Sequence, residues 1–102
     1  MTTEMANIAA AIQSDYMTAE QLTQYIDKGH RDKKRHVRKC ISLLIREGYP
    51  IINLQDGRGY RMTNDVTLLK KFYNQERSRA LDRLVTLKNI RKTIKAQEEL
   101  EQ

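Results

Sequence analysis

No glycine and no proline occurs after residue 64, and this absence limits the possible folds of the chain more than any other feature. Since these two residues are the strongest helix breakers, residues 65 to about 96 can form one uninterrupted helix, ~48 Å long at ~1.5 Å per residue. Thr63 and Asn64 precede this helix, and either side chain could cap its first turn. The turns of the fold must therefore lie in the first part of the chain.

An apolar repeat runs along the expected long helix. Apolar side chains recur every seven residues, with others three or four positions away, at Val66, Leu69, Tyr73, Ala80, Leu84, Leu87, Ile90 and Ile94. Such a repeat is typical of a helix that pairs with another helix. We interpret these residues as the dimerisation surface of a homodimer. The alternatives are a protein partner bound by the same helix, or a helix folded back on its own domain.

Two short helices are expected near the N-terminus. Apolar residues at helical spacing predict the first helix over residues 3–13. Thr18 followed three residues later by Gln21 is a capping-box pattern, which predicts the start of a second helix. The apolar face of this second helix is formed by Leu22, Tyr25 and Ile26. A polar link from Asp27 to Asp32, which contains Gly29, then ends it.

A third helix carries much of the positive charge of the chain. Asp32 is its expected N-cap, and Gly48 stops it after Glu47. Its buried stripe is expected to consist of Val37, Cys40, Ile41 and Leu44. Successive helical residues rotate by ~100°, so the opposite face presents Arg35, Arg38, Lys39, Ser42 and Arg46. We expect this face to contact base edges in the major groove of duplex DNA, and Lys33 and Lys34 at the helix start to contact phosphates.

A small β-hairpin is expected after the third helix. Residues 51–54 are β-prone, Gln55 to Gly59 form a tight reversal around Asp-Gly, and residues 60–62 return as the second strand. Arg58 lies between two glycines at the tip, where it could enter a minor groove or remain a solvated turn residue. We place Arg61 on the returning strand in the same predicted DNA-binding set.

The segment Val37–Met62, VRKCISLLIREGYPIINLQDGRGYRM, resembles the winged helix family found at the N-terminus of biotin-type repressors and in many small bacterial and phage regulators. The matching positions are Val37, Ile41 and Leu44, then Gly48 to Ile51, and finally Gly59 to Met62. The resemblance implies a winged helix-turn-helix DNA-binding domain over residues 1–62. Residues 63–102 would then be the long amphipathic helix for dimerisation or partner binding, and the fold class would be mainly α with a small β-hairpin.

The charge of the chain favours a polyanionic partner. Its 102 residues include 19 Lys and Arg against 13 Asp and Glu, which gives a formal net charge of +6. The only charged side chains in residues 1–26 are acidic, so the positive charge is concentrated further along the chain. We therefore expect double-stranded DNA as the partner of a regulator of transcription or replication, of the size that phages and other mobile elements encode.

Other chemistry has little support in the sequence. No glycine-rich phosphate loop, nucleophile elbow or catalytic carboxylate pair is present, so we expect neither an enzyme nor a cofactor. His30, His36 and Cys40 imitate a metal-binding set, but no fourth ligand is evident, and we interpret Cys40 as a core residue and expect no metal. A single cysteine fits the reducing cytoplasm, and the N-terminal residues resemble neither a signal peptide nor a membrane span.

Two other functions stay open from the sequence. The first is a protein-interaction module, for instance an inhibitor of a host nucleic-acid enzyme, that uses the winged domain and the long helix to clamp its partner. The second is RNA binding. It ranks last, because five Tyr and one Phe give few stacking platforms for single strands.

Overall fold

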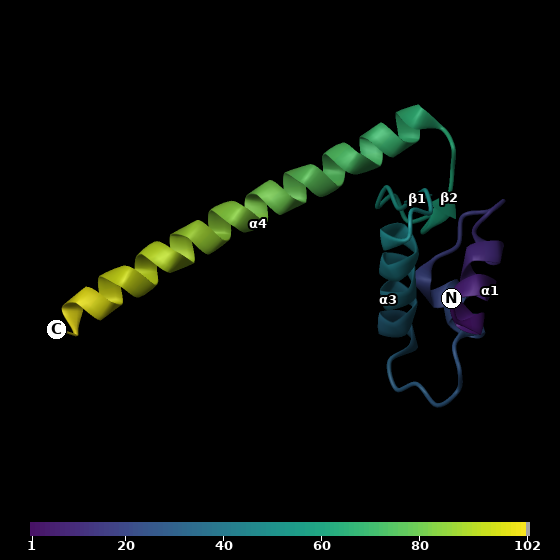
Figure 1. Cartoon of the computed structure of the whole chain (residues 1–102), viewed down its shortest axis with the longest axis horizontal. Helices are drawn as coiled ribbons and strands as arrows, with labels where there is room; N and C mark the ends of the chain where they lie inside the picture. Colours follow the sequence, from purple (N-terminus) through teal and green to yellow (C-terminus); the bar gives the residue numbers. More distant parts are fainter. Residues whose placement is uncertain (102) are drawn as a thin grey trace. The chain divides into compact units, whose positions relative to one another are not determined.

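The computed structural model describes residues 1–101, and its elements are mainly helical (Figure 1). In chain order these elements are α1 (Thr3–Ala11), α2 (Ala19–Leu22), the 3₁₀ helix η1 (Thr23–Tyr25), α3 (Lys33–Arg46), β1 (Ile51–Ile52), β2 (Arg61–Met62) and α4 (Val66–Leu100). The prediction of a mainly α chain with a small antiparallel β pair and a long last helix is confirmed. The chain divides into two compact units, one from Met1 to Phe72 and one from Tyr73 onward.

The predicted caps of α2 and α3 are present. Thr18 Oγ1 accepts a hydrogen bond from Gln21 N at 3.1 Å, and Gln21 Oε1 accepts one from Thr18 N at 2.9 Å, which completes the capping box. Asp32 Oδ1 accepts from Arg35 N at 3.1 Å at the start of α3. These bonds satisfy amide groups that a helix start leaves without an intrahelical partner. Helix α1 ends slightly earlier than predicted, at Ala11.

The long helix is capped by a residue that the sequence did not single out. Asp65 Oδ1 accepts from Thr67 N at 2.9 Å and from Leu68 N at 3.4 Å, so neither Thr63 nor Asn64 caps α4. Thr63 Oγ1 instead accepts from Asp65 N at 3.0 Å and orders the turn before the helix. Helix α4 continues past the expected end near residue 96. No helix among residues 1–101 combines the length and apolar character needed to cross a bilayer.

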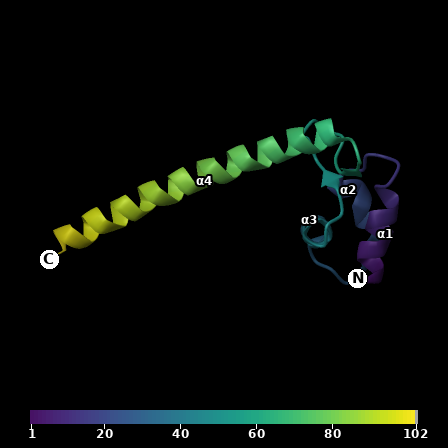
Figure 2. The same ribbon diagram turned by 45° about the horizontal axis from the view of Figure 1, so that its top comes forward.

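A single hydrophobic core lies among α1, α2, α3 and β1. Both α1 and α2 pack on α3, and the two views in Figures 1 and 2 agree in placing them beside it. The buried residues are Met5, Ile8, Ala9, Ile12, Leu22, Ile26, Val37, Cys40, Ile41, Leu44, Ile51, Ile52 and Leu54. The predicted apolar stripes are thus confirmed. Cys40, which is 3% exposed, is a core residue as predicted.

The hairpin is shorter than predicted, but its returning segment is held from both sides. Its register pairs Ile51 with Met62 and Ile52 with Arg61. Residues 53–54 leave the ladder, and Tyr60 pairs with Met17 instead of β1. Tyr60 N donates to Met17 O at 2.7 Å, and Met17 N donates to Tyr60 O at 2.9 Å. Because Met62 N also donates to Ile12 O at 2.8 Å, the hairpin is fixed to the chain between α1 and α2.

Gly59 makes the pairing of Tyr60 with Met17 possible. Its φ is +97°, and a Cβ atom built there would lie 2.2 Å from Met17 O and 2.6 Å from Thr18 Cα. A side chain would therefore overlap two backbone groups and would also require an unfavourable backbone conformation. The close approach of the two segments requires glycine at this position.

Replacing Gly59 by alanine is expected to lower the free energy of unfolding by about 3 kcal/mol, because a backbone clash adds to the cost of the positive φ. Gly57 also has a positive φ, of +90°, but a Cβ atom added there would have no atom within 4 Å. Gly57→Ala should therefore lower the free energy of unfolding by only about 1–2 kcal/mol. Gly29→Ala has neither feature and should change the stability little. Urea denaturation of the three variants measures the difference, and equal losses at Gly57 and Gly59 would contradict the close approach.

Candidate nucleic-acid interface

The face of α3 opposite its buried stripe is exposed and strongly basic. The exposed side chains here are Arg35, Arg38, Lys39, Ser42 and Arg46. Within residues 1–101, no carboxylate forms an ion pair with any of the four basic residues in this group. Their positive charges are therefore available to an anionic ligand.

The two lysines at the start of α3 are less freely presented. Lys33 is half-buried. Lys34 Nζ lies 2.5 Å from Glu20 Oε2, a contact between α3 and α2 that the sequence did not predict. An exposed ion pair of this kind contributes little to stability, so a phosphate oxygen can replace the carboxylate. Lys34 is thus exposed but paired with Glu20, whereas Lys33 presents less of its side chain to solvent.

The arginine near the hairpin tip is held in place by two neighbours. Arg58 Nη2 and Nε lie 2.7 Å and 2.9 Å from Asp56 Oδ2, and the guanidinium lies 4.2 Å from the centroid of the Tyr16 ring. The hydrogen bond from the Arg58 side chain lowers the pKa of Asp56, and the same bond raises the pKa of Arg58. The side chain is still 54% exposed, so the guanidinium is accessible to solvent although Asp56 and Tyr16 contact it.

Arg61 shares the aromatic neighbour of Arg58. Its guanidinium lies 5.3 Å from the Tyr16 ring centroid, and the residue is half-buried on β2. Its Nε atom is buried and has no hydrogen-bond partner among residues 1–101. Arg61 therefore offers less surface to a ligand than the α3 arginines do. Nothing in the sequence marked Tyr16, because it reaches both arginines only through the pairing of Met17 with Tyr60.

A hollow of about 570 Å³ lies where α2, α3 and the hairpin meet. Its lining consists of Thr18, Ala19, Arg38, Asn53, Gln55, Gly57, Gly59 and Tyr60. Asn53 and Gln55 add amide groups beside Arg38, and Asn53 Oδ1 accepts a hydrogen bond from Gln55 N at 3.0 Å. Amide and guanidinium groups are the donors that recognise base edges and phosphates. Nothing in the sequence pattern marked these two amides as site residues.

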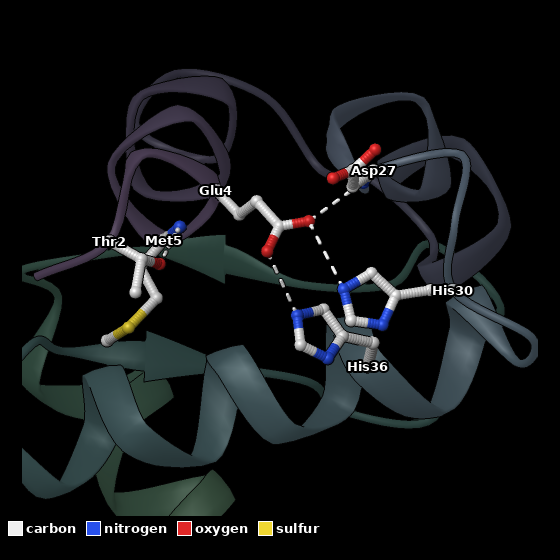
Figure 3. Close-up of polar contacts among 6 residues, drawn as sticks. All are labelled: Thr2, Glu4, Met5, Asp27, His30 and His36. Carbon is white, nitrogen blue, oxygen red and sulfur yellow. Dashed lines mark hydrogen bonds and ion pairs between the residues drawn. The ribbon is translucent and has the colours of Figure 1, made fainter.

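A second polar cluster joins α1 to the start of α3 (Figure 3). Glu4 Oε2 accepts from Asp27 N at 2.8 Å, and the Nε2 atoms of His36 and His30 lie 3.1 Å and 4.0 Å from its carboxylate oxygens. The bond from Asp27 is the main cause that lowers the pKa of Glu4. The two histidines thus form a group with Glu4 and not with Cys40. Burial raises the pKa of the Cys40 thiol.

The apolar repeat of α4 is exposed along the helix. Six of its predicted dimerisation residues are 50–64% exposed: Val66, Tyr73, Leu84, Leu87, Ile90 and Ile94. Ala80 is also exposed, whereas Leu69 is half-buried. None of the residues of α4 is fully buried. An exposed apolar stripe of this length is a common feature of surfaces that associate with other molecules.

Comparisons of the chain with protein-family models, with curated proteins and with solved structures found no match.

The contacts of Glu4 predict a contribution to stability that acid removes. Because folding lowers the pKa of Glu4, this contribution is complete above its pKa in the unfolded chain and is lost as the pH falls through its pKa in the folded chain. The difference in free energy of unfolding between the wild type and Glu4→Gln should therefore shrink as the pH falls from about 6 to about 3. Denaturation curves across this range measure it.

Glu98→Gln removes an exposed carboxylate of α4 and serves as the control, which should follow the wild type at each pH. A penalty for Glu4→Gln that stayed constant down to the lowest pH would contradict the role of the ionised carboxylate.

Proposed function

We propose that residues 1–62 form a winged helix-turn-helix domain that binds double-stranded DNA, and that the chain is a dimeric, non-enzymatic regulator of transcription or replication in the cytoplasm. The observation that carries this proposal is the exposed face of α3, whose four basic side chains lack an internal ion pair within residues 1–101. The other side of α3 is buried in the core, so its basic face is the side that can enter the major groove, where arginine and lysine contact base edges.

The order of the elements supports the winged helix assignment. The helix α1, the continuous pair α2 and η1, and the helix α3 precede an antiparallel hairpin, which is the order that the winged helix resemblance implies. The pairing of Tyr60 with Met17 fixes the hairpin beside α2 and α3, so that the hairpin and α3 present one continuous surface around the hollow at Arg38. A DNA duplex against this surface would meet α3 and the hairpin together.

The proposed contacts divide into two kinds. Arg38 and Lys39, on the exposed face of α3, are placed to reach base edges, with Asn53 and Gln55 at the adjoining hollow. Lys34 and Arg58 are placed to contact the sugar-phosphate backbone or a narrow minor groove. The binding constant should fall as salt is added. For each phosphate contact, its logarithm should fall by about 0.9 per tenfold rise in salt concentration, so several contacts give a steep dependence.

The exposed stripe of α4 supports pairing of two chains. Two identical DNA-binding domains related by a twofold axis bind inverted half-sites, which lie ~34 Å apart when they are separated by one turn of the duplex. We therefore propose a palindromic target. The same stripe also fits the helix of a different protein, and it is the observation that keeps a protein-interaction module as the second candidate function.

The double substitution Arg38→Ala, Lys39→Ala should weaken specific duplex binding by about 100-fold or more, because two charged contacts are lost together. Arg91→Ala, Lys92→Ala removes the same charge from α4 and should change the affinity only slightly. Gel-shift titrations measure both, with circular dichroism as the check that helix content is retained. Absence of wild-type binding at micromolar concentration and physiological salt would reject the DNA proposal and favour the protein-interaction module.

Leu87→Asp should convert the dimer to a monomer, because a carboxylate would be placed within the apolar stripe that pairs the chains. Asn89→Asp introduces the same charge two residues further on, away from the stripe, and should leave the mass unchanged. Light scattering after size-exclusion chromatography measures the mass of each variant. A wild type that already has the mass of one chain would contradict the proposed dimer.

A further inference from the structure

The two histidines of this chain lie side by side, although they come from different segments. The rings of His30 and His36 stack with their centroids 3.9 Å apart. His30 belongs to the link before α3, and His36 belongs to the first turns of α3. Figure 3 shows an Nε2 atom of each ring directed at the carboxylate of Glu4, which comes from the first turn of α1. Three segments thus contribute one metal-ligating group each.

The spacing of the three groups is close to that of a metal site. Their ligand atoms all lie within 4.8 Å of one another, and Glu4 Oε1 lies 3.1 Å from His36 Nε2. A tetrahedral zinc ion with bonds of ~2.0–2.1 Å places its ligands ~3.3 Å apart. One pair therefore already has the required separation. The two rings are stacked and nearly parallel, so the ring of His30, in an exposed link, must turn as well as shift before both Nε2 atoms can point at one ion.

The surroundings of the cluster select the kind of ion. Two imidazole nitrogens and one carboxylate oxygen are typical ligands of zinc and its neighbours, whereas calcium and magnesium require mainly oxygen. The adjoining surface also carries three cations, Arg31, Arg35 and Lys39, against one carboxylate, Asp32, and its net positive charge repels a weakly held cation. Only an ion that forms strong bonds to imidazole can overcome this repulsion.

The cluster is both supported from behind and open to solvent. The hydrogen bond from Asp27 N orients the Glu4 carboxylate, as outer hydrogen bonds do for metal ligands. The side chains of His30, Glu4 and His36 are 40%, 24% and 24% exposed. An ion can therefore enter from solvent and keep a water molecule as its fourth ligand.

We propose that Glu4, His30 and His36 form a binding site for a divalent transition-metal ion of the zinc type. The bound ion ties the link between η1 and α3 to α1 and so fixes the start of α3. The site goes beyond the proposed DNA binding and does not depend on it, because none of its three ligands belongs to the proposed DNA-contacting set.

Calorimetric titration of the full chain with Zn²⁺ tests this site in the absence of DNA. One ion per chain should bind, with a Kd on the order of 1–10 µM. His30→Ala and Glu4→Gln should each weaken binding by about 10-fold or more, since each removes or weakens one of three ligands. Glu98→Gln is the matched control and should bind as the wild type does. Zinc should also raise the Tm of the wild type more than that of His30→Ala.

Cobalt substitution identifies the ligands. Co²⁺ in the site should give the intense visible absorption of a tetrahedral ion without the near-ultraviolet band of a thiolate ligand, because Cys40 is buried in the core and is not one of the three residues whose ligand atoms are grouped here. A thiolate band would overturn the assignment, as would unchanged zinc affinity in His30→Ala or no binding by the folded wild type at about 100 µM zinc. His30 lies in an exposed link, so its removal leaves the core intact and the test valid. Gel shifts play no part in these measurements, so loss of the DNA proposal would not affect them.

Discussion

The backbone pairing of Tyr60 with Met17 positions most of the surface described above. It joins the hairpin to the segment between α1 and α2, and Gly59 permits the approach because it has no side chain. Through this pairing Tyr16 comes under Arg58 and Arg61, and the hairpin closes one side of the hollow at Arg38. Without it, two short strands of two residues each would have little to hold them in place.

Helix α3 has a buried apolar stripe, an exposed basic face and a histidine that contacts α1. Its buried stripe supplies a large part of the core, and four basic side chains on its opposite face, Arg35, Arg38, Lys39 and Arg46, lack internal ion pairs within residues 1–101. Between these two faces lies His36, which contacts Glu4 of α1. The 3.6-residue period of a helix allows this division, since residues one position apart point in directions ~100° apart. The packing of α3 and the presentation of its charge are thus consequences of the same spacing.

The features that the sequence predicted are those that local rules control. The capping box at Thr18, the cap at Asp32 and the apolar stripe of α3 depend on residues within a few positions of one another. Their patterns are therefore visible in the sequence. The exposed basic face of α3 follows from the same helical spacing.

The features that the sequence did not predict depend on contacts between distant segments or on one residue of register. Asp65 caps α4 because the helix starts one residue later than a cap at Asn64 required and two residues later than a cap at Thr63 required. Tyr16 meets Arg58, and Glu4 meets both histidines, only after the chain has folded.

The contacts of Arg58 with Asp56 and Tyr16 also affect how this side chain would bind an anion. A long flexible side chain normally loses rotamer entropy when it binds, and the contacts with Asp56 and Tyr16 favour one arrangement of Arg58 before an anion binds. Its contact with an anion would therefore be an exchange of one oxygen partner for another at low entropic cost.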